Sequence, residues 1–339
     1  SLDNLKHYPV MLDQILSIIS PQHGGTFIDC TFGGGGYSKA ILKFPNTNVI
    51  AIDRDDLTQK HANLLLSDYP KRFAFFKDKF SNLDKVTESD LNPKAIIFDL
   101  GISSYQLSDE ERSFSFYSKN FLNMEMGINK RSAYEVINTF DKEYLGNIIK
   151  ILGDEKEGRL IANKIVKYRI KKPIKTSEEL VNIIKSAKKN HSNYKKNPAT
   201  KTFQAIRIFV NQELTELISG LVQATKLLKN GGKLIVVTFN SLEDKIVKNF
   251  FNLYSNLKKN PSRYLPIKEK KSNLFEILSK KPLYPDLKEI KENIRSRSSK
   301  LRYAIRSNNS FFYPEEFENK FQNFLELESG KIWLTKANG

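Results

Sequence analysis

Apolar runs and helically spaced apolar residues alternate along the first hundred residues. The runs TFIDCT, NVIAID, RFAFF and KAIIFDL predict four strands, at residues 26–31, 48–53, 72–76 and 94–100. Apolar strands separated by helical segments are typical of a parallel sheet with right-handed crossover connections. The first part of the chain is therefore expected to form an α/β sheet.

The pattern becomes helical from about residue 132 to residue 189. The sequence TSEE at residues 176–179 has the spacing of a capping box, in which Thr and Glu side chains satisfy N–H groups at the start of a helix. A longer helix is predicted over residues 202–229, where apolar residues follow helical steps up to the pair Gly231 and Gly232. The region therefore predicts a helical insertion.

Strand signals return after the insertion. KLIVVTF predicts a strand at residues 233–239, KLRYAIR predicts a last strand at 300–306, and residues 315–326 have the spacing of an amphipathic helix. We therefore divide the chain into a first core part at residues 1–125, a helical insertion for substrate recognition at 126–200, a second core part at 201–310 and a C-terminal tail at 311–339.

The charge balance changes the picture. The 339 residues contain 55 Lys and Arg against 38 Asp and Glu, a formal net charge of +17. Such a field attracts polyanions such as nucleic acids, although a basic solubility surface gives the same count. The sequence has no run of eighteen apolar residues and no apolar signal region. We therefore expect a cytoplasmic location and no membrane partner. Cys30 is the single cysteine, which excludes an intramolecular disulfide, and the four histidines lack metal-ligand spacing.

The most specific local signal is the run of glycines from Gly33 to Gly36, between a predicted strand and a predicted helix. Glycines let a ligand approach the backbone closely at a helix N-terminus. Asp53 follows Gly33 by 20 residues and ends the next strand, where an acidic side chain can accept hydrogen bonds from ribose hydroxyls. This arrangement suits both NAD and S-adenosylmethionine. Asp99 at the end of the fourth strand, and Gly231 before a later strand, resemble the class I methyltransferase pattern and favour the second.

Longer motifs then occur in a consistent order. They are HYPVML at 7–12, the glycine segment, DLGISSYQL at 99–107, RSFSF at 112–116, PATKTFQAIR at 198–207, NQEL at 211–214 and FNSLEDKIVK at 239–248. Together they resemble the bacterial ribosomal RNA small-subunit methyltransferase H family. The resemblance implies a class I, Rossmann-like methyltransferase sheet and S-adenosylmethionine-dependent methylation of the N4 amino group of a cytidine. The implied substrate lies in the decoding region of small-subunit ribosomal RNA, free or in the small ribosomal subunit, and a homodimer is left open.

The same resemblance implies a set of site residues. The cofactor pocket would consist of Gly35, Gly36 and Tyr37 at the methionine end, Asp53 at the ribose, Phe80 at the adenine, and Asp99 and Gln106 completing it. Asp99 is also the candidate catalytic residue, because an acceptor at the target amine would orient it and remove charge as the new bond forms. Without the resemblance, Phe80 would be interpreted as a core aromatic and Gln106 as a surface amide.

Two departures from the family keep alternatives open. Tyr37 stands where the family usually has His, and residues 123–127 read NMEMG where the family commonly has Asp-Met-Arg-Met-Asp. One alternative is therefore an RNA-binding or ribosome-assembly protein that keeps the cofactor pocket without efficient turnover. A second is an NAD-dependent oxidoreductase, although no substrate domain with a catalytic His or Tyr is evident.

Basic residues that could contact RNA form two groups in the sequence. One consists of Lys188, Lys189, Lys195 and Lys196; the other consists of Arg295, Arg297, Lys300, Arg302 and Arg306, with Tyr303 among them. We expect the groups, rather than any single Lys, to provide phosphate contacts.

Overall fold

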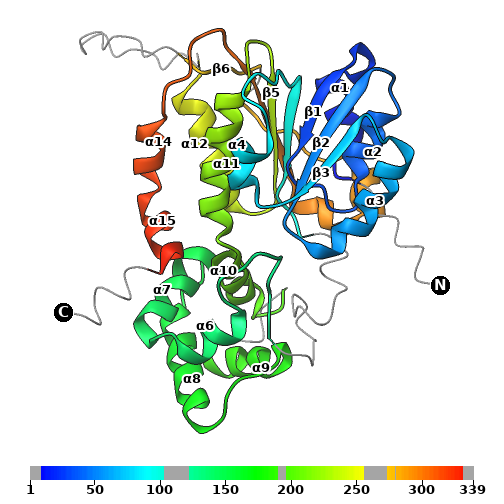
Figure 1. The fold of residues 1–339 in the computed structure, drawn as a ribbon. Coiled ribbons are helices and arrows are strands. Elements are labelled where there is room, and N and C mark those ends of the chain that lie inside the picture. Colours follow the sequence, from blue (N-terminus) through cyan, green and yellow to red (C-terminus); the bar gives the residue numbers. More distant parts are fainter. Residues whose placement is uncertain (1–8, 103–121, 190–195, 256–272, 279, 331–339) are drawn as a thin grey trace, which may run out of the picture. The chain divides into compact units, whose positions relative to one another are not determined.

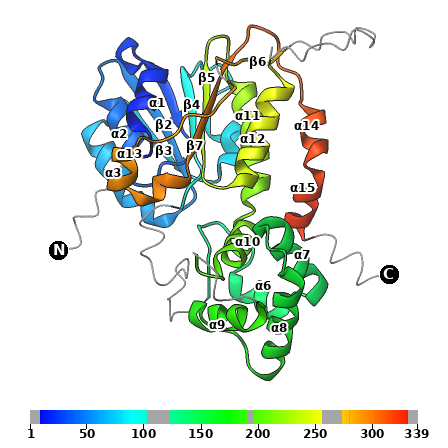
Figure 2. The same ribbon diagram turned by 180° about the vertical axis from the view of Figure 1, so that it is seen from behind.

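The computed structural model describes residues 9–102, 122–189, 196–255, 273–278 and 280–330. The chain divides into two compact units (Figures 1 and 2). The sheet unit contains Ser1–Gly101 and Glu216–Phe321, and the helical unit contains Ile102–Thr215 and Gln322–Gly339. Each unit is therefore assembled from segments that are distant in sequence. No helix among the described residues is long and apolar enough to cross a membrane.

The sheet unit is built on seven strands in the order β3-β2-β1-β4-β5-β7-β6. The strands are β1 (Gly25–Asp29), β2 (Thr47–Asp53), β3 (Phe73–Lys77), β4 (Ala95–Asp99), β5 (Lys233–Thr238), β6 (Phe275–Glu276) and β7 (Lys300–Arg306). Neighbours among the first five are parallel, and β7 runs antiparallel to β5 and to β6. The predicted α/β class I methyltransferase sheet, interrupted between β4 and β5 by helices, is confirmed.

Helices cover both faces of this sheet (Figures 1 and 2). One face carries α1 (Leu12–Ile19), α2 (Gly36–Leu42) and α3 (Gln59–Asp68), and the other carries α4 (Leu83–Val86), α11 (Glu213–Leu227) and α12 (Ser241–Leu253). Phe27, Ile97 and Val237 point into the core under the first three helices, with Ile15 and Ile41 packed on them. Burial on both faces explains why these strands are apolar without alternation.

The register brings the ends of three strands to one edge. Asp29 of β1 pairs with Ala51 on one side and with Ile97 on the other, so β2 and β4 flank β1. The connection from β1 goes to one side and β4 lies on the other, which is where open α/β sheets form a crevice for ligands. The carboxyl ends of β1, β2 and β4 therefore position the candidate site.

The helical unit contains α6 (Ala133–Thr139), α7 (Lys142–Gly153), α8 (Gly158–Lys171), α9 (Ser177–Ala187), α10 (Thr200–Asn211) and α15 (Gln322–Ser329). The predicted Thr cap begins α9: the Thr176 side chain accepts the Glu179 N–H at 3.2 Å, whereas the Glu179 carboxylate accepts the N–H of Lys175, one residue before the cap, at 3.0 Å. Local capping therefore specifies this helix start, as its sequence predicted.

The single helix predicted over residues 202–229 is wrong. Helix α10 ends at Asn211 and α11 starts at Glu213, because Gln212 adopts a left-handed conformation with φ 48°. The Gln212 N–H bonds to the carbonyls of Ile208 and Phe209, and Arg207 pairs with Glu213 at 2.9 Å across the break. The helix predicted at 315–326 is also divided, into α14 (Glu315–Lys320) and α15, at Phe321.

The last described helix supplies a cap within the helical unit. The buried Glu328 carboxylate accepts the N–H groups of Leu214 and Thr215 at 3.2 and 2.7 Å and the Thr215 hydroxyl at 2.6 Å. Burial raises the pKa of Glu328 to about 8. The Tyr144 hydroxyl also bonds to the Leu327 carbonyl. Residues that the sequence assigned to a tail are thus part of the core of this unit.

Close packing of α7 against α10 generates a prediction. A Cβ atom on Gly153 would lie well inside van der Waals contact of the Lys201 carbonyl oxygen, whereas one on Gly146, in the same helix, would lie 3.6 Å from the nearest atom. Gly153→Ala should lower the free energy of unfolding by about 1–3 kcal/mol through overpacking. Gly146→Ala should instead leave stability unchanged or raise it by up to about 1 kcal/mol through helix propensity. Urea unfolding of both variants tests this, and equal effects would contradict it.

Candidate active site

The glycine turn joins β1 to α2 and is tied to both neighbouring strands. The Cys30 N–H bonds to the Ile97 carbonyl and the Phe32 N–H bonds to the Ile52 carbonyl. Gly33 and Gly35 have φ of 55° and 81°, in the left-handed region that favours glycine. The turn therefore has a fixed path over the ends of β2 and β4.

The glycines of this turn face different surroundings. A Cβ on Gly35 would lie 2.8 Å from the Phe32 ring, and one on Gly36 would lie 2.8 Å from Pro9. These two predicted cofactor residues are packed against the protein's own side chains. A Cβ on Gly33 would meet only the Thr31 carbonyl oxygen, at 3.9 Å. Gly33, which the sequence did not single out as a ligand contact, leaves the backbone accessible.

Asp53 ends β2 beside this turn. Its Oδ2 accepts the Gly33 N–H at 2.7 Å and its Oδ1 accepts the Asp55 N–H at 2.9 Å. Each oxygen of an ionised carboxylate can accept a further hydrogen bond, so the side chain can still receive ribose hydroxyls. Burial raises the pKa of Asp53 to about 7, against the opposing effect of these two N–H groups.

Asp29 ends β1 and is fully buried. Its Oδ2 accepts the Ser38 hydroxyl at 2.7 Å, and its Oδ1 accepts the Thr31 N–H at 3.3 Å. Burial raises the pKa of Asp29 to about 6. The sequence reasoning included Asp29 in the glycine segment but assigned it no role, although its place at the end of a strand before the glycines was a usable signal.

Asp99 ends β4 and contacts the predicted cofactor residue Tyr37. The Tyr37 hydroxyl donates to the Val10 carbonyl at 2.6 Å and lies 3.3 Å from Asp99 Oδ2. The Asp99 N–H bonds to Thr31 Oγ1 at 2.7 Å, which fixes the backbone. Asp99 Oδ1 is buried, and no donor among the described residues reaches it with the geometry of a hydrogen bond, although the nearby Gly101 N–H lowers the pKa of the carboxyl. A buried acceptor without a partner is costly, which makes this atom a candidate ligand contact.

A positive charge lies near this carboxyl. Burial raises the pKa of Asp99 to about 6, and the guanidinium of Arg295 opposes the rise. Arg295 lies in the 3-10 helix η6 (Ile294–Ser298), and burial lowers its own pKa. Sequence reasoning placed Arg295 among the candidates for RNA contact, and its charge acts on Asp99.

The remaining predicted pocket residues are Phe80 and Gln106. Phe80 begins the 3-10 helix η4 (Phe80–Asn82) after β3, is partly buried, and packs edge-on against Phe98 with ring centroids 5.1 Å apart. Phe98 precedes Asp99 in β4, so this aromatic pair adjoins the same edge. Gln106 lies outside the described residues.

The electrostatic character of the edge follows from three carboxyl groups. Asp29, Asp53 and Asp99 end adjacent strands, and Asp29 raises the pKa of Asp53 as Asp99 raises that of Asp29. No Lys or Arg of the described residues forms an ion pair with any of them. The edge therefore favours a cationic ligand and disfavours an anionic group.

The structure corrects two of the proposed RNA contacts. Lys188 is buried and pairs with Glu155 at 2.6 Å, so it supports the helical unit and is unavailable to phosphate. Arg306 is buried and donates to backbone carbonyls of Thr225, Leu274 and Asn309. A buried cation is retained where acceptors surround it, and the sequence could not show those acceptors. Lys195 lies outside the described residues.

The departing segment at residues 123–127 is a structured loop of the helical unit. The Asn211 side chain accepts the Met126 N–H and donates to the Met124 carbonyl, both at 2.9 Å. Asn123 Oδ1 accepts the Glu125 N–H at 2.7 Å. Asn123 thus has a local structural role where the family commonly has Asp.

Comparison with known proteins adds independent findings. The model of the MraW methylase family matches residues 4–307. A protein of Afipia carboxidovorans named ribosomal RNA small subunit methyltransferase H is 43% identical over 307 residues, which are 90% of this chain and 92% of that protein. A protein of Ehrlichia chaffeensis with the same name is 42% identical over 304 residues, 88% of this chain and 99% of that one. A solved rRNA methylase from Streptococcus thermophilus covers 86% of this chain and 95% of its own, with 11% identity and a TM-score of 0.38.

The three carboxyl groups predict how stability depends on pH. Their pKa values lie above the ordinary value of 3.8, so the folded protein retains protons that the unfolded chain releases. In the absence of ligand, the contribution of these three groups to stability should fall as pH rises from about 4 to about 7, by at most about 1.4 kcal/mol per unit of pKa shift, and the loss from Glu328 continues to about pH 8. Urea unfolding at pH 5 and pH 8 measures the loss. Asp53→Asn should make it smaller, and an equal loss in this variant would contradict the assignment.

Proposed function

The chain belongs to the MraW methylase family, and we propose that it methylates the N4 amino group of a cytidine in the decoding region of small-subunit ribosomal RNA. The relatives named ribosomal RNA small subunit methyltransferase H support the RNA class of the substrate. The observation that carries the chemistry is the buried Oδ1 of Asp99, to which no donor in the described part of the chain bonds, at an edge that favours a cation. We also propose that the helical insertion at 126–200 recognises the RNA.

The methyl donor is S-adenosylmethionine, and the residues at the edge fit it. Bound there, it supplies an electrophilic methyl group on a positively charged sulfur. Asp53 would accept the ribose hydroxyls, and the open space beside the Gly33 Cα would admit the ligand between the turn and the strand ends. The carboxyls of Asp29, Asp53 and Asp99 outnumber the one cation, Arg295, whose charge acts on Asp99, and would stabilise the positive charge of the ligand.

The same carboxyls argue against the NAD alternative. A dinucleotide brings a pyrophosphate to the glycine turn, at the N-terminus of the following helix. Here Asp29 lies against that turn, with its carboxylate bonded to Ser38 of the first turn of α2. Repulsion between this carboxylate and a pyrophosphate would weaken NAD binding, whereas a sulfonium is attracted.

Asp99 would act on the substrate amine. The cytosine amino group is a weak nucleophile because its lone pair is conjugated with the ring, and an acceptor at its N–H orients it and takes up charge. With a pKa of about 6, the Asp99 carboxyl is ionised near neutral pH. Tyr37 lies at Oδ2 and is itself held by the Val10 carbonyl, so it would leave Oδ1 directed at the amine.

The burial of Cys30 argues for nitrogen, rather than carbon 5, as the atom that is methylated. Methylation at carbon 5 of a pyrimidine generally needs a Cys thiolate that attacks carbon 6. Cys30 is 1% exposed, and burial raises the pKa of its thiol well above the ordinary value. A buried, protonated thiol serves the core and not nucleophilic attack.

The first test of this function is cofactor binding. By calorimetry, the wild type should bind S-adenosylmethionine and not NAD. Asp53→Ala should weaken binding by about 1–3 kcal/mol, because ribose hydroxyls lose their acceptor. Asp56→Ala is the matched control, since Asp56 is exposed and pairs with Lys77. Preferential binding of NAD by the wild type would exclude a methyltransferase.

A second test addresses the chemistry, on ribosomal RNA from a strain that lacks this methyltransferase. The product nucleoside should be N4-methylcytidine, which fragmentation mass spectrometry separates from 5-methylcytidine. The rate should fall as pH drops through about 6, where Asp99 takes up a proton. Asp99→Asn should lower kcat at least about 100-fold, the usual scale for a general base, and Cys30→Ser should retain much of the activity.

Two outcomes would contradict this mechanism. One is 5-methylcytidine as the product, and the other is a folded, cofactor-bound Cys30→Ser protein without activity. A wild type that binds the cofactor and the RNA but transfers no methyl group would instead support the alternative of an assembly protein.

A further inference from the structure

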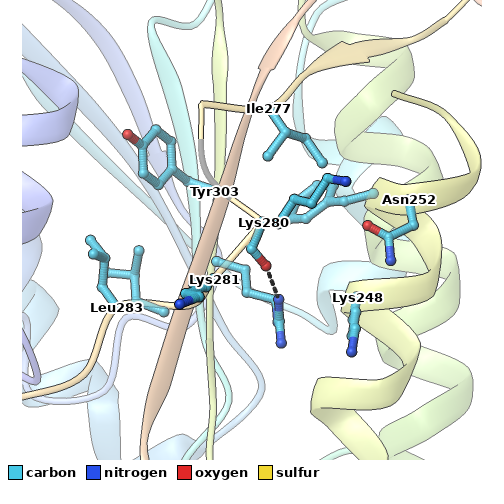
Figure 3. Close-up of a pocket in the computed structure, with 10 residues that line it drawn as sticks. Lys248, Asn252, Ile277, Lys280, Lys281, Leu283 and Tyr303 are labelled. Atoms are coloured by element: carbon cyan, nitrogen blue, oxygen red, sulfur yellow. Dashed lines mark hydrogen bonds between the residues drawn. The ribbon is translucent and has the colours of Figure 1, made fainter. Parts of the chain in front are cut away.

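A pocket opens at the outer edge of β7, away from the glycine turn (Figure 3). Its lining comes from α12, from β7 and from the chain that follows β6. Lys248, Lys280 and Lys281 contribute basic groups, and Ile277, Leu283 and Tyr303 contribute apolar surface. Figure 3 shows these six side chains on both sides of β7.

The pocket arises because β7 loses its partner strand over a short stretch. Glu276 of β6 pairs with Ile305, and Leu283 forms an isolated bridge with Leu301. Between these pairs the outer chain uses residues 277–282 where β7 uses residues 302–304. Because the two stretches differ in length, the pairing is interrupted there, as at a bulge, and the pocket lies between its two paired ends.

The exposed edge also presents backbone groups. Leu301 exchanges both of its backbone hydrogen bonds with Leu283, at 2.9 Å each. Because the direction of these groups alternates along an antiparallel strand, Tyr303 turns its N–H to the same outer edge. An N–H at the floor of a basic pocket is a suitable donor for an oxyanion.

The positive charge of the pocket is only partly neutralised. Arg302 is held by Asp244 at 2.8 Å and donates to the Lys280 carbonyl at 3.2 Å. Burial alone would raise the pKa of Asp244, but hydrogen bonds and charge from Arg302 hold it below the ordinary value. Lys248 and Lys280 are exposed, and no carboxylate among the described residues forms an ion pair with either.

We propose that this pocket binds a backbone phosphate of the substrate RNA, with the adjoining sugar against the apolar wall. The proposal rests on the function proposed above and adds a second point of contact. Strands β4, β5 and β7 are consecutive in the sheet, so the edge of β7 lies roughly 10 Å from the backbone of β4. RNA with its target base at Asp99 therefore has flanking nucleotides within reach of the pocket.

The test compares two charge-matched triple variants. The pocket set is Lys248→Ala, Lys280→Ala and Lys281→Ala; the control set is Lys39→Ala, Lys60→Ala and Lys71→Ala, at exposed positions around α2 and α3. Fluorescence anisotropy with a labelled RNA fragment of the decoding region, at several KCl concentrations, gives the Kd and its salt dependence.

The pocket set should raise Kd about tenfold and lower the log–log salt slope by about 0.7, the change expected for one lost phosphate contact on a single strand. The control set should change Kd less than about twofold. A Lys→Arg version of the pocket set should retain most of the affinity. Calorimetry should give unchanged S-adenosylmethionine binding for all sets, which shows that they are folded.

Equal losses in the two alanine sets would overturn the proposal, since the effect would then come from the general field of the protein. Unchanged RNA affinity with lost binding to phosphatidylglycerol vesicles would also overturn it, in favour of a membrane surface. Failure of the proposed function is distinguishable: the wild type would transfer no methyl group while the difference between the alanine sets in RNA affinity persists.

Discussion

The site depends on three carboxyl groups gathered at one edge of the sheet. No Lys or Arg of the described residues forms an ion pair with them, although the charge of Arg295 acts on Asp99. The register of β1, β2 and β4 brings Asp29, Asp53 and Asp99 together, and burial opposes their ionisation. Neutral donors bond to the three carboxyl groups and partly offset the cost of their burial. These donors are the Gly33 N–H, the Ser38 hydroxyl and the Tyr37 hydroxyl. These bonds hold the turn in place and leave the negative charge available, which is the arrangement that a positively charged methyl donor needs.

Structural features that depend on residues close together in the chain could be predicted from the sequence. Each central strand is a continuous apolar run because both of its faces are covered, and α9 begins where Thr176 and Glu179 supply its cap. Asp53 and Asp99 were found because the end of a strand marks the edge of the sheet. These features depend on neighbours in the chain or on one elementary rule of topology.

Other features depend on tertiary neighbours and were missed. The break at Gln212 needs Arg207 and Glu213 to pair across it, and strand β6 is too short to leave a pattern. Gly36 was named because the family resemblance implied it, and the letters GGGG do not tell which glycine packs against Pro9 and which, like Gly33, has open space at the Cβ position. The lysines make the same point: Lys188 and Lys189 are adjacent, yet one is buried on Glu155 and the other is exposed. A net charge describes the whole molecule and does not locate a binding surface.

The cap that Glu328 places on α11 has a consequence for how the chain is made. The helical unit takes its helices α6 to α10 from the middle of the sequence, but the carboxylate that satisfies Leu214 and Thr215 comes from one of the last described residues. Domains generally fold as units during synthesis, from the N-terminus onward. This unit has to wait on the ribosome with the start of α11 uncapped until Glu328, 113 residues after Thr215, has been translated.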